Sequence, residues 1–228
     1  LFRETYISDI VKRNKIRNVG ELEALLDVLS SAIGALTNPN KLQKTFKSVN
    51  CSKITATTIT KYIEYLEDAF LIEEAVRYDI KGKSYIGTPL KYYFVDLGLR
   101  NARINYRQIE ITHSMENVIY NELRMRGFSV DVGNLTIVEN GKDGKAVKKQ
   151  LEVDFICNKG SKKYYIQSAY QLGTEEKLAQ EIRPFLKIKD CFKKIVITSD
   201  TPKPCYTDEG ILMMNVYDFL LNPELIDL

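Results

Sequence analysis

Hydrophobic residues recur every three or four positions in the first seventy residues, which is the period of an amphipathic helix. The predicted helices cover residues 1–14, 19–34, 41–49 and about 55–70. A turn rich in Asn and Pro, at residues 38–40, precedes the third helix. Thr55 is placed to cap the fourth helix, because its hydroxyl can accept a backbone N–H near Thr58. A short helix, a tight turn and a longer helix predict a helix-turn-helix.

Two runs with the character of strands follow, at residues 71–78 and 92–95, separated by KGKSYIGTPLK. A hairpin after a helix-turn-helix is a wing, so we predict a winged-helix domain in residues 1–110. In such a domain the residues expected to contact duplex DNA are Thr57, Thr58, Thr60 and Lys61 on the fourth helix, and Lys81, Lys83 and Lys91 at the wing tip. Glu64, Glu67 and Asp68 make the far end of the same helix acidic, and phosphates would repel it. A role in protein contacts therefore stays open.

After residue 110 the pattern alternates between helices and short strands. We predict helices at residues 113–126, 174–187 and 217–221, strands at 128–132, 135–139, 151–157, 164–170, 194–198 and 210–216, and loops at 101–108 and 140–149. This order predicts an α/β sandwich around a mixed sheet in residues 111–228. The whole chain is thus expected to be α/β (α+β), with two domains.

The strand pair within LEVDFICNKGSKKYYIQSAY carries the candidate chemistry. Period-2 alternation places Asp154 on one side of the first strand, opposite Leu151, Val153 and Phe155. On the second strand, Gln167 and Ala169 share a face. The carboxylate of Asp154 is therefore expected to face the amide of Gln167, as in part of a divalent-metal site.

Composition narrows the classes of protein. The chain of 228 residues is 44% hydrophobic and 28% charged, and no apolar run approaches the roughly 18 residues of a membrane helix. Its four cysteines include no Cys-x-x-Cys pair, so we expect reduced thiols in a cytoplasmic protein. Residues 1–110 hold 17 Lys and Arg against 13 Asp and Glu, whereas residues 111–228 hold 16 against 17. The first half is the better candidate for an anionic partner.

Several familiar catalytic motifs are missing or incomplete. The segment GKSYIGT at residues 82–88 has glycines at P-loop spacing, but Thr88 and Pro89 stand where Lys and Ser or Thr are required. His113 is the only histidine, and no Ser or Cys in a nucleophile motif lies near it. Because the chain opens on Leu1 inside a helical pattern, we expect a fragment of a longer polypeptide.

In order and over nearly its whole length, the chain resembles the C-terminal region of bacterial and archaeal AAA-type ATPases, in which a P-loop domain precedes a domain of unknown function. The resemblance is carried by TATTITKYIEYLEDAFLIEEAVRYDIKGKS, KYYFVDLGLRNA, SMENVIYNELRMRGFSVDVG, LEVDFI, YYIQSAYQL and EIRPFLKIKDCFKKIVIT. It implies a winged helix followed by a domain similar to the PD-(D/E)XK nuclease fold. It also implies that ATP binds only in an upstream ATPase domain of the same polypeptide.

In active nucleases of that fold, a helical Glu, a strand Asp and the acid of (D/E)-x-K hold Mg²⁺, while the Lys positions water. By this resemblance Glu116 matches the helical Glu and Asp154 the strand Asp, so these two would be the metal ligands. Gln167 and Ala169 stand where the second acid and the Lys belong. Loss of that lysine implies a degenerate, non-catalytic domain without a cofactor of its own.

Three hypotheses remain at this stage. The first is a non-catalytic C-terminal region that binds double-stranded DNA, or a partner protein, for an upstream ATPase domain. The second is a Mg²⁺-dependent DNA nuclease that uses Glu116 and Asp154, with Lys163 or Lys177 as a relocated lysine. The third is a protein-interaction module without a nucleic-acid role.

Overall fold

The computed structural model describes residues 6–49, 54–107, 109–140, 143 and 145–228. Contacts divide the chain into two units. The first unit comprises Leu1–Ala75 and Thr88–Glu110, and the second comprises Val76–Gly87 and Ile111–Leu228. The tip of the predicted wing therefore folds with the second unit.

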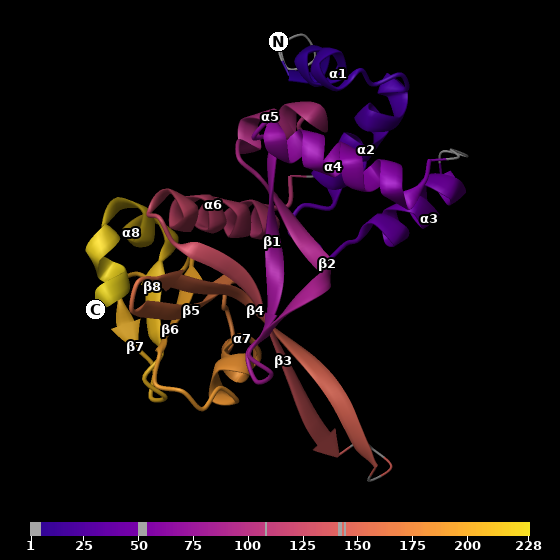
Figure 1. Ribbon diagram of the computed structural model, residues 1–228. Coiled ribbons are helices and arrows are strands. Elements are labelled where there is room, and N and C mark those ends of the chain that lie inside the picture. The colour runs from indigo at the N-terminus through magenta and orange to yellow at the C-terminus, as the bar shows by residue number, and fades with distance from the viewer. Residues whose placement is uncertain (1–5, 50–53, 108, 141–142, 144) are drawn as a thin grey trace. The chain divides into compact units, whose positions relative to one another are not determined.

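Helices dominate the first unit (Figure 1). They are α1 (Ser8–Asn14), α2 (Val19–Ser31), α3 (Pro39–Val49), α4 (Ala56–Asp68) and α5 (Leu97–Arg103). The first four lie where the hydrophobic period predicts them, and residues 1–5 of the first predicted helix lie outside the described residues. Helix α5 replaces the start of the loop predicted at residues 101–108. Its N-terminus is capped by Asp96, whose Oδ1 accepts hydrogen bonds from the backbone N–H groups of Gly98 and Leu99 at 2.6 and 3.2 Å.

The core of the first unit is made by the apolar faces of these helices. Its buried residues include Leu22, Leu25, Leu26 and Leu29 of α2, Ile59, Ile63 and Leu66 of α4, Leu71 after α4, and Ile72, Tyr92 and Phe94 from the neighbouring strands. Arg100 of α5 is also buried, and its Nε donates to the carbonyl of Ser30 at 2.7 Å. This buried hydrogen bond joins α5 to α2.

The strands are β1 (Ile72–Asp79), β2 (Ser84–Phe94), β3 (Ser129–Asn140), β4 (Ala146–Lys159), β5 (Lys162–Ala169), β6 (Lys193–Thr198), β7 (Cys205–Tyr206) and β8 (Leu212–Asn215). Their order in the sheet is β2-β1-β3-β4-β5-β6-β8-β7. The β1–β3, β5–β6 and β6–β8 pairs are parallel, and the β3–β4, β4–β5 and β7–β8 pairs are antiparallel. The prediction of a mixed sheet in an α/β protein is confirmed.

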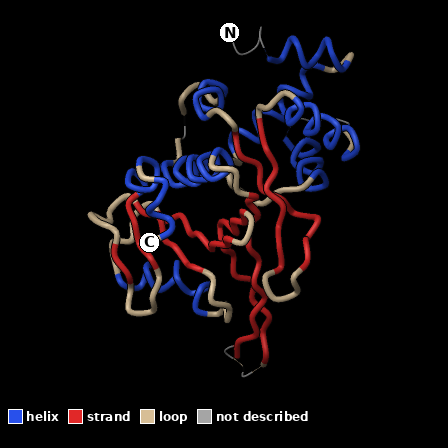
Figure 2. Tube along the Cα trace, turned by 60° about the vertical axis from the view of Figure 1, so that its left-hand side comes forward, coloured by secondary structure: helices blue, strands red, loops and turns tan. Residues whose placement is uncertain are grey.

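Helices cover both faces of this sheet in the second unit (Figures 1 and 2). On one face lie α6 (Ile111–Met125) and α8 (Val216–Leu221), followed by a short 3₁₀ helix at Pro223–Asp227. Helix α7 (Glu175–Leu186) covers the other face, where Ile182 and Phe185 belong to one cluster with Val153, Tyr165 and Val196. The result is a layered α/β arrangement.

Strand β3 differs from the two short strands predicted at residues 128–132 and 135–139. It is continuous, because Gly133 permits a close approach of the strands rather than breaking one. A Cβ built at Gly133 would lie 2.8 Å from the Cβ of Val153. Strand β4 likewise begins at Ala146, inside the loop predicted at residues 140–149. The two long strands project together from the sheet as a two-stranded arm (Figure 1).

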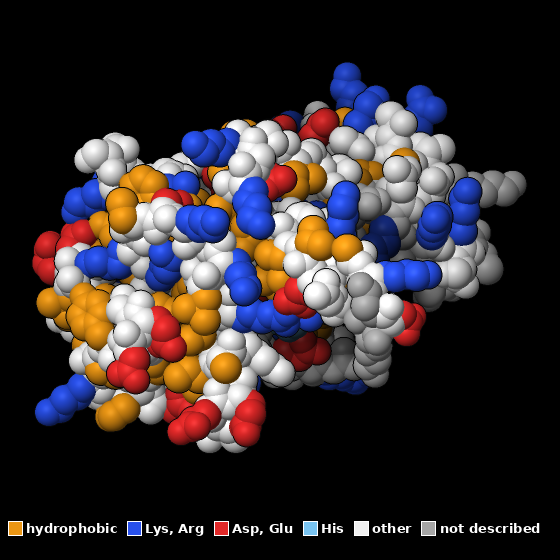
Figure 3. All heavy atoms as spheres, turned by 90° about the horizontal axis from the view of Figure 1, so that it is seen from below, with side chains coloured by type: hydrophobic (Ala, Val, Ile, Leu, Met, Phe, Trp, Pro, Cys, Tyr) orange, Lys and Arg blue, Asp and Glu red, His pale blue; other side chains and the backbone are white. Residues whose placement is uncertain are grey.

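The part of the chain that the structure describes contains no helix with both the length and the apolar character needed to cross a bilayer. Its surface is mixed. On the face drawn in Figure 3, Lys and Arg side chains stand among acidic and hydrophobic ones.

Candidate functional site

The N-terminal half of α4 presents the residues predicted to contact DNA. Thr55 caps the helix as predicted, since its Oγ1 accepts from the N–H of Thr58 at 3.2 Å. The Oγ1 atoms of these two residues are 2.9 Å apart, so the hydroxyl of Thr58 is engaged in the cap. Thr57, Thr60 and Lys61 are exposed. The exposed residues offer two hydroxyls and one ammonium on the surface of α4.

A hollow of about 480 Å³ lies beside these residues in the first unit. Its lining comprises Asn38, Pro39, Asn40, Ala56, Thr57, Thr60, Lys61, Glu64 and Thr88. Amide and hydroxyl groups predominate, with one cation and one carboxylate. Such groups can hydrogen-bond to phosphates, sugars and base edges.

Helix α3 adds a basic row that the sequence reasoning missed. Lys41, Lys44 and Lys47 are all exposed, whereas Leu42 and Phe46 are buried in the core. Lysines at this spacing lie along one side of a helix. The three-residue spacing was readable in the sequence as the polar side of an amphipathic helix.

The second half of α4 is acidic. Burial, together with the nearby carboxylate of Glu74, raises the pKa of Glu67 to about 7. Burial also raises the pKa of Glu74. Glu64 and Asp68 are exposed. A phosphate backbone would therefore be favoured only along the first half of the helix.

The predicted wing tip is corrected by the structure. Lys91 is not at a tip: it lies in the buried part of β2 with 4% of its surface exposed. Lys81 and Lys83 are in the exposed turn between β1 and β2, within the second unit. The Nζ of Lys81 donates to the carbonyl of Thr136 on β3 at 3.1 Å. Parallel pairing of β1 with β3 draws this turn to the sheet, which sequence periodicity does not reveal.

A β-bulge surrounds Asp154. Gly133 pairs with Val153 and Asp131 with Ile156, so β4 has one residue more than β3 between the two pairs. Phe155 consequently packs against Tyr120 of α6, with ring centroids 6.2 Å apart, while Val153 faces α7. The prediction that Phe155 shares a side with Leu151 and Val153 is therefore wrong.

Asp154 and Gln167 meet, although not as predicted. Oδ2 of Asp154 accepts a hydrogen bond from the backbone N–H of Ser168 at 2.8 Å. In a regular antiparallel pair of strands, a backbone carbonyl would accept this bond. The amide oxygen of Gln167 accepts from the N–H of Asp154 at 3.3 Å, and its Nε2 donates to Glu181 of α7 at 3.1 Å. The amide therefore bonds the backbone of Asp154 and a carboxylate that the sequence reasoning missed.

Glu116 lies in the first half of α6 and is buried, with 6% of its surface exposed. Its Oε2 is 3.7 Å from Nδ1 of His113, one turn earlier. Among the described residues, no group of three or more His, Cys, Asp or Glu side chains is arranged to hold a metal ion. The proposed pair of metal ligands, Glu116 and Asp154, stays a prediction.

The two candidate relocated lysines have different surroundings. The ammonium of Lys163 lies 5.0 Å from the ring centroid of Tyr165 and 5.2 Å from that of Phe192. It stands four residues from Gln167 along β5, or about 13 Å at the usual rise of a strand. Lys177 is one helical turn before Glu181 in α7, on the same side of the helix. Lys177 is therefore the better placed of the two.

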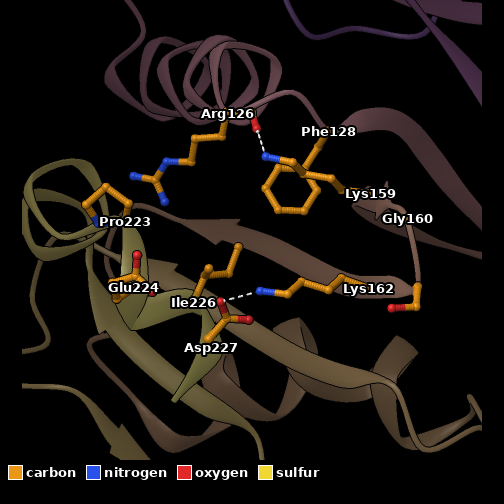
Figure 4. Close-up of a pocket in the computed structure, with 10 residues that line it drawn as sticks. Arg126, Phe128, Lys159, Gly160, Lys162, Pro223, Glu224, Ile226 and Asp227 are labelled. Carbon is orange, nitrogen blue, oxygen red and sulfur yellow. Dashed lines mark hydrogen bonds and ion pairs between the residues drawn. The ribbon is translucent and has the colours of Figure 1, made fainter.

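A second hollow, of about 540 Å³, lies between the β4–β5 turn and the C-terminal 3₁₀ helix (Figure 4). Its charged groups largely satisfy one another. Nζ of Lys162 is 2.7 Å from Asp227, and Nζ of Lys159 donates to the carbonyl of Arg126 at 2.5 Å. The guanidinium of Arg126 pairs with Glu122 at 2.7 Å. The Lys162–Asp227 pair anchors the C-terminal segment to the sheet.

The first part of the chain matches a described protein family. Residues 1–110 match a family described as a domain of unknown function (DUF8612). The description names neither an ATPase nor a winged helix. The chain is therefore an α/β protein whose first 110 residues match that family, and the resemblance to AAA-type ATPases stays a prediction.

Two curated proteins are similar over nearly the whole chain. An uncharacterized protein of Haemophilus influenzae is 35% identical over 221 residues, which cover 97% of this chain and 51% of that protein. Uncharacterized protein MJ1544 of Methanocaldococcus jannaschii is 30% identical over 219 residues, which cover 93% of this chain and 44% of that protein. The chain thus spans about half the length of the curated relatives it matches.

One solved structure, the crystal structure of protein VC1899 from Vibrio cholerae, aligns with 99% of this chain and 54% of that chain. The identity is 12% and the TM-score is 0.31. A likeness of this size supports no argument about fold or function.

Proposed function

We propose that this chain binds duplex DNA through α3 and α4 without cleaving it. The observation that carries the proposal is the exposed row of Lys41, Lys44 and Lys47 on α3, beside the exposed Thr57 and Lys61 of α4. Lysines on the first helix of a helix-turn-helix suit the phosphate backbone, and short polar side chains at the start of the second suit the floor of a groove.

The surroundings of the bulge favour binding without hydrolysis. Oδ2 of Asp154 accepts from the backbone of β5, and the amide of Gln167 is bonded at both ends. Ala169 supplies no lysine at the position where nucleases of this fold carry one. A metal-dependent reaction requires several carboxylates and a proton-handling group, and Gln167 and Ala169 supply neither.

The second part of the proposal concerns the polypeptide. Because the curated relatives are about twice as long as this chain, we propose that it acts as one part of a longer protein. The resemblance to AAA-type ATPases suggests that an ATPase domain precedes it and that the chain couples DNA to that domain. This coupling would require contacts beyond those described above.

Binding and cleavage are tested together. The chain is incubated with labelled duplex DNA and Mg²⁺ at several salt concentrations, and mobility and fragment length are read from one gel. We expect a shift that weakens with salt, without fragments. Each phosphate contact should contribute about −0.9 to the slope of log affinity against log salt.

Variants identify the surface. Lys44→Glu and Lys61→Glu should each weaken binding and make the salt slope less steep by about 1. Lys203→Glu, which changes the charge equally at an exposed site of the second unit, is the matched control. Equal effects of all three variants would refute the α3–α4 surface. Cleavage abolished by Asp154→Ala would instead establish the nuclease alternative, with Lys177 as its first candidate lysine.

A further inference from the structure

The two-stranded arm of the second unit is not part of the α3–α4 surface that we propose to bind DNA. It consists of residues 136–140 of β3 and 146–150 of β4, paired from Thr136–Gln150 to Asn140–Ala146. All five residues on its β4 side are exposed. Ile137 is the one residue of the arm that is buried in the core of the second unit, and an exposed two-stranded ribbon is marginal in water. Its length is therefore better explained by a partner than by folding.

One face of the arm carries a concentration of positive charge. Arg183 of α7 pairs with Glu139 of β3. The hydrogen bond from Arg183, with further attraction from Lys149 and Lys187, lowers the pKa of the Glu139 carboxyl. One cation from α7 pairs with this carboxylate, and two more, from the C-terminal cap of α7 and from β4, attract it. This excess of cations leaves the face suited to an additional anion.

Other lysines border the arm at its base and along its opposite face. The ammonium of Lys81 lies against the carbonyl of Thr136, 3.1 Å away. Lys148 is exposed and is paired across the arm with Val138. Val138 itself is 63% exposed. Figure 3, which views the molecule from the side toward which the arm projects, shows Lys and Arg side chains beside hydrophobic and acidic ones.

The dimensions of the arm suit a nucleic-acid groove. Paired strands are about 5 Å apart, and the major groove of B-DNA, about 12 Å wide, admits a two-stranded ribbon. Lysines along the edges would then reach phosphates on either side. Exposed valines would contact base edges, including the methyl group of thymine.

We propose that the arm and the C-terminal end of α7 form a second binding surface for duplex DNA. The ribbon enters a groove, and the phosphates are met by Lys81, Lys148, Lys149, Arg183 and Lys187. The inference rests on the proposed function, which it deepens by assigning a contact surface to the second unit. It also gives Lys81 a phosphate-binding role through the sheet rather than through a wing.

The test compares two double variants of the full chain in duplex binding at several salt concentrations. Lys148→Glu with Lys149→Glu should weaken affinity about tenfold or more and make the salt slope less steep by about 2. Lys12→Glu with Lys203→Glu is the matched control: it changes the net charge equally at exposed sites that belong to neither proposed surface. Circular dichroism and the thermal midpoint establish that both variants fold.

A second variant tests the shape of the contact. Val138→Ser removes an exposed apolar side chain without changing charge, so it should weaken binding while leaving the salt slope unchanged. If the unaltered chain does not bind duplex DNA, both the proposed function and this inference fail. If it binds and the arm variant behaves like its control, only the inference fails. Competition by polyglutamate as strong as that by DNA would overturn the inference in favour of an acidic protein partner.

Discussion

The pH dependence of the first unit should depend on Glu67. This residue lies near the end of α4, where burial and the carboxylate of Glu74 raise its pKa from 4.5 to about 7, against a smaller lowering by a backbone hydrogen bond. In the unfolded chain its pKa returns to an ordinary value near 4.5. Between these values the folded state therefore binds more protons than the unfolded state does.

The sign of the effect follows from this difference. The stabilising contribution of protonated Glu67 is fully present below about pH 4.5 and is lost as the pH rises through about 7. A shift of about 2.5 pKa units corresponds to at most about 3.4 kcal/mol. Because Glu67 is only partly buried and solvent screens its charge, we expect about 1–2 kcal/mol.

The assay measures unfolding by circular dichroism in urea at a series of pH values. Subtracting the profile of Glu67→Gln from that of the unaltered chain isolates the contribution of this carboxyl. The difference should grow by about 1–2 kcal/mol from pH 5 to pH 8, with the Gln variant becoming relatively more stable. Glu110→Gln, at an exposed position of the first unit whose charge does not act on Glu67, is the control for the change in charge. Parallel profiles for the unaltered chain and Glu67→Gln would refute the reasoning.

Three further predictions concern packing, capping and metal. Gly133→Ala places a Cβ 2.8 Å from that of Val153 and should destabilise the second unit by about 1–3 kcal/mol, measured as a lower thermal midpoint. Gly87→Ala is the control, because no atom lies within 4 Å of its new Cβ, and it should leave the midpoint unchanged. Thr55→Ala should cost about 1 kcal/mol through loss of the α4 cap, whereas Thr55→Ser should retain it. Millimolar Mg²⁺ should leave the thermal midpoint unchanged, and a rise abolished by Asp154→Asn would contradict the non-catalytic reading.

The amino-acid sequence by itself determined the first four helices of the first unit and the mixed character of the sheet. The cap at Thr55 and the apolar side of α4 depend on residues at most a few positions apart, so local chemistry is sufficient to predict them. The same holds for Thr174, whose Oγ1 accepts from the N–H of Lys177 at the start of α7. In each case the hydrogen-bonding partners and the hydrophobic positions lie within a few residues of one another in the sequence.

Tertiary structure decided the details of both candidate surfaces. One extra residue in β4 moves Phe155 to the α6 face, and α7 brings Glu181 to Gln167. Pairing with β3 joins the predicted wing tip to the second unit, and the same sheet buries Lys91. These outcomes depend on which distant strands pair and in what register, because a strand alternates its faces without specifying its neighbour.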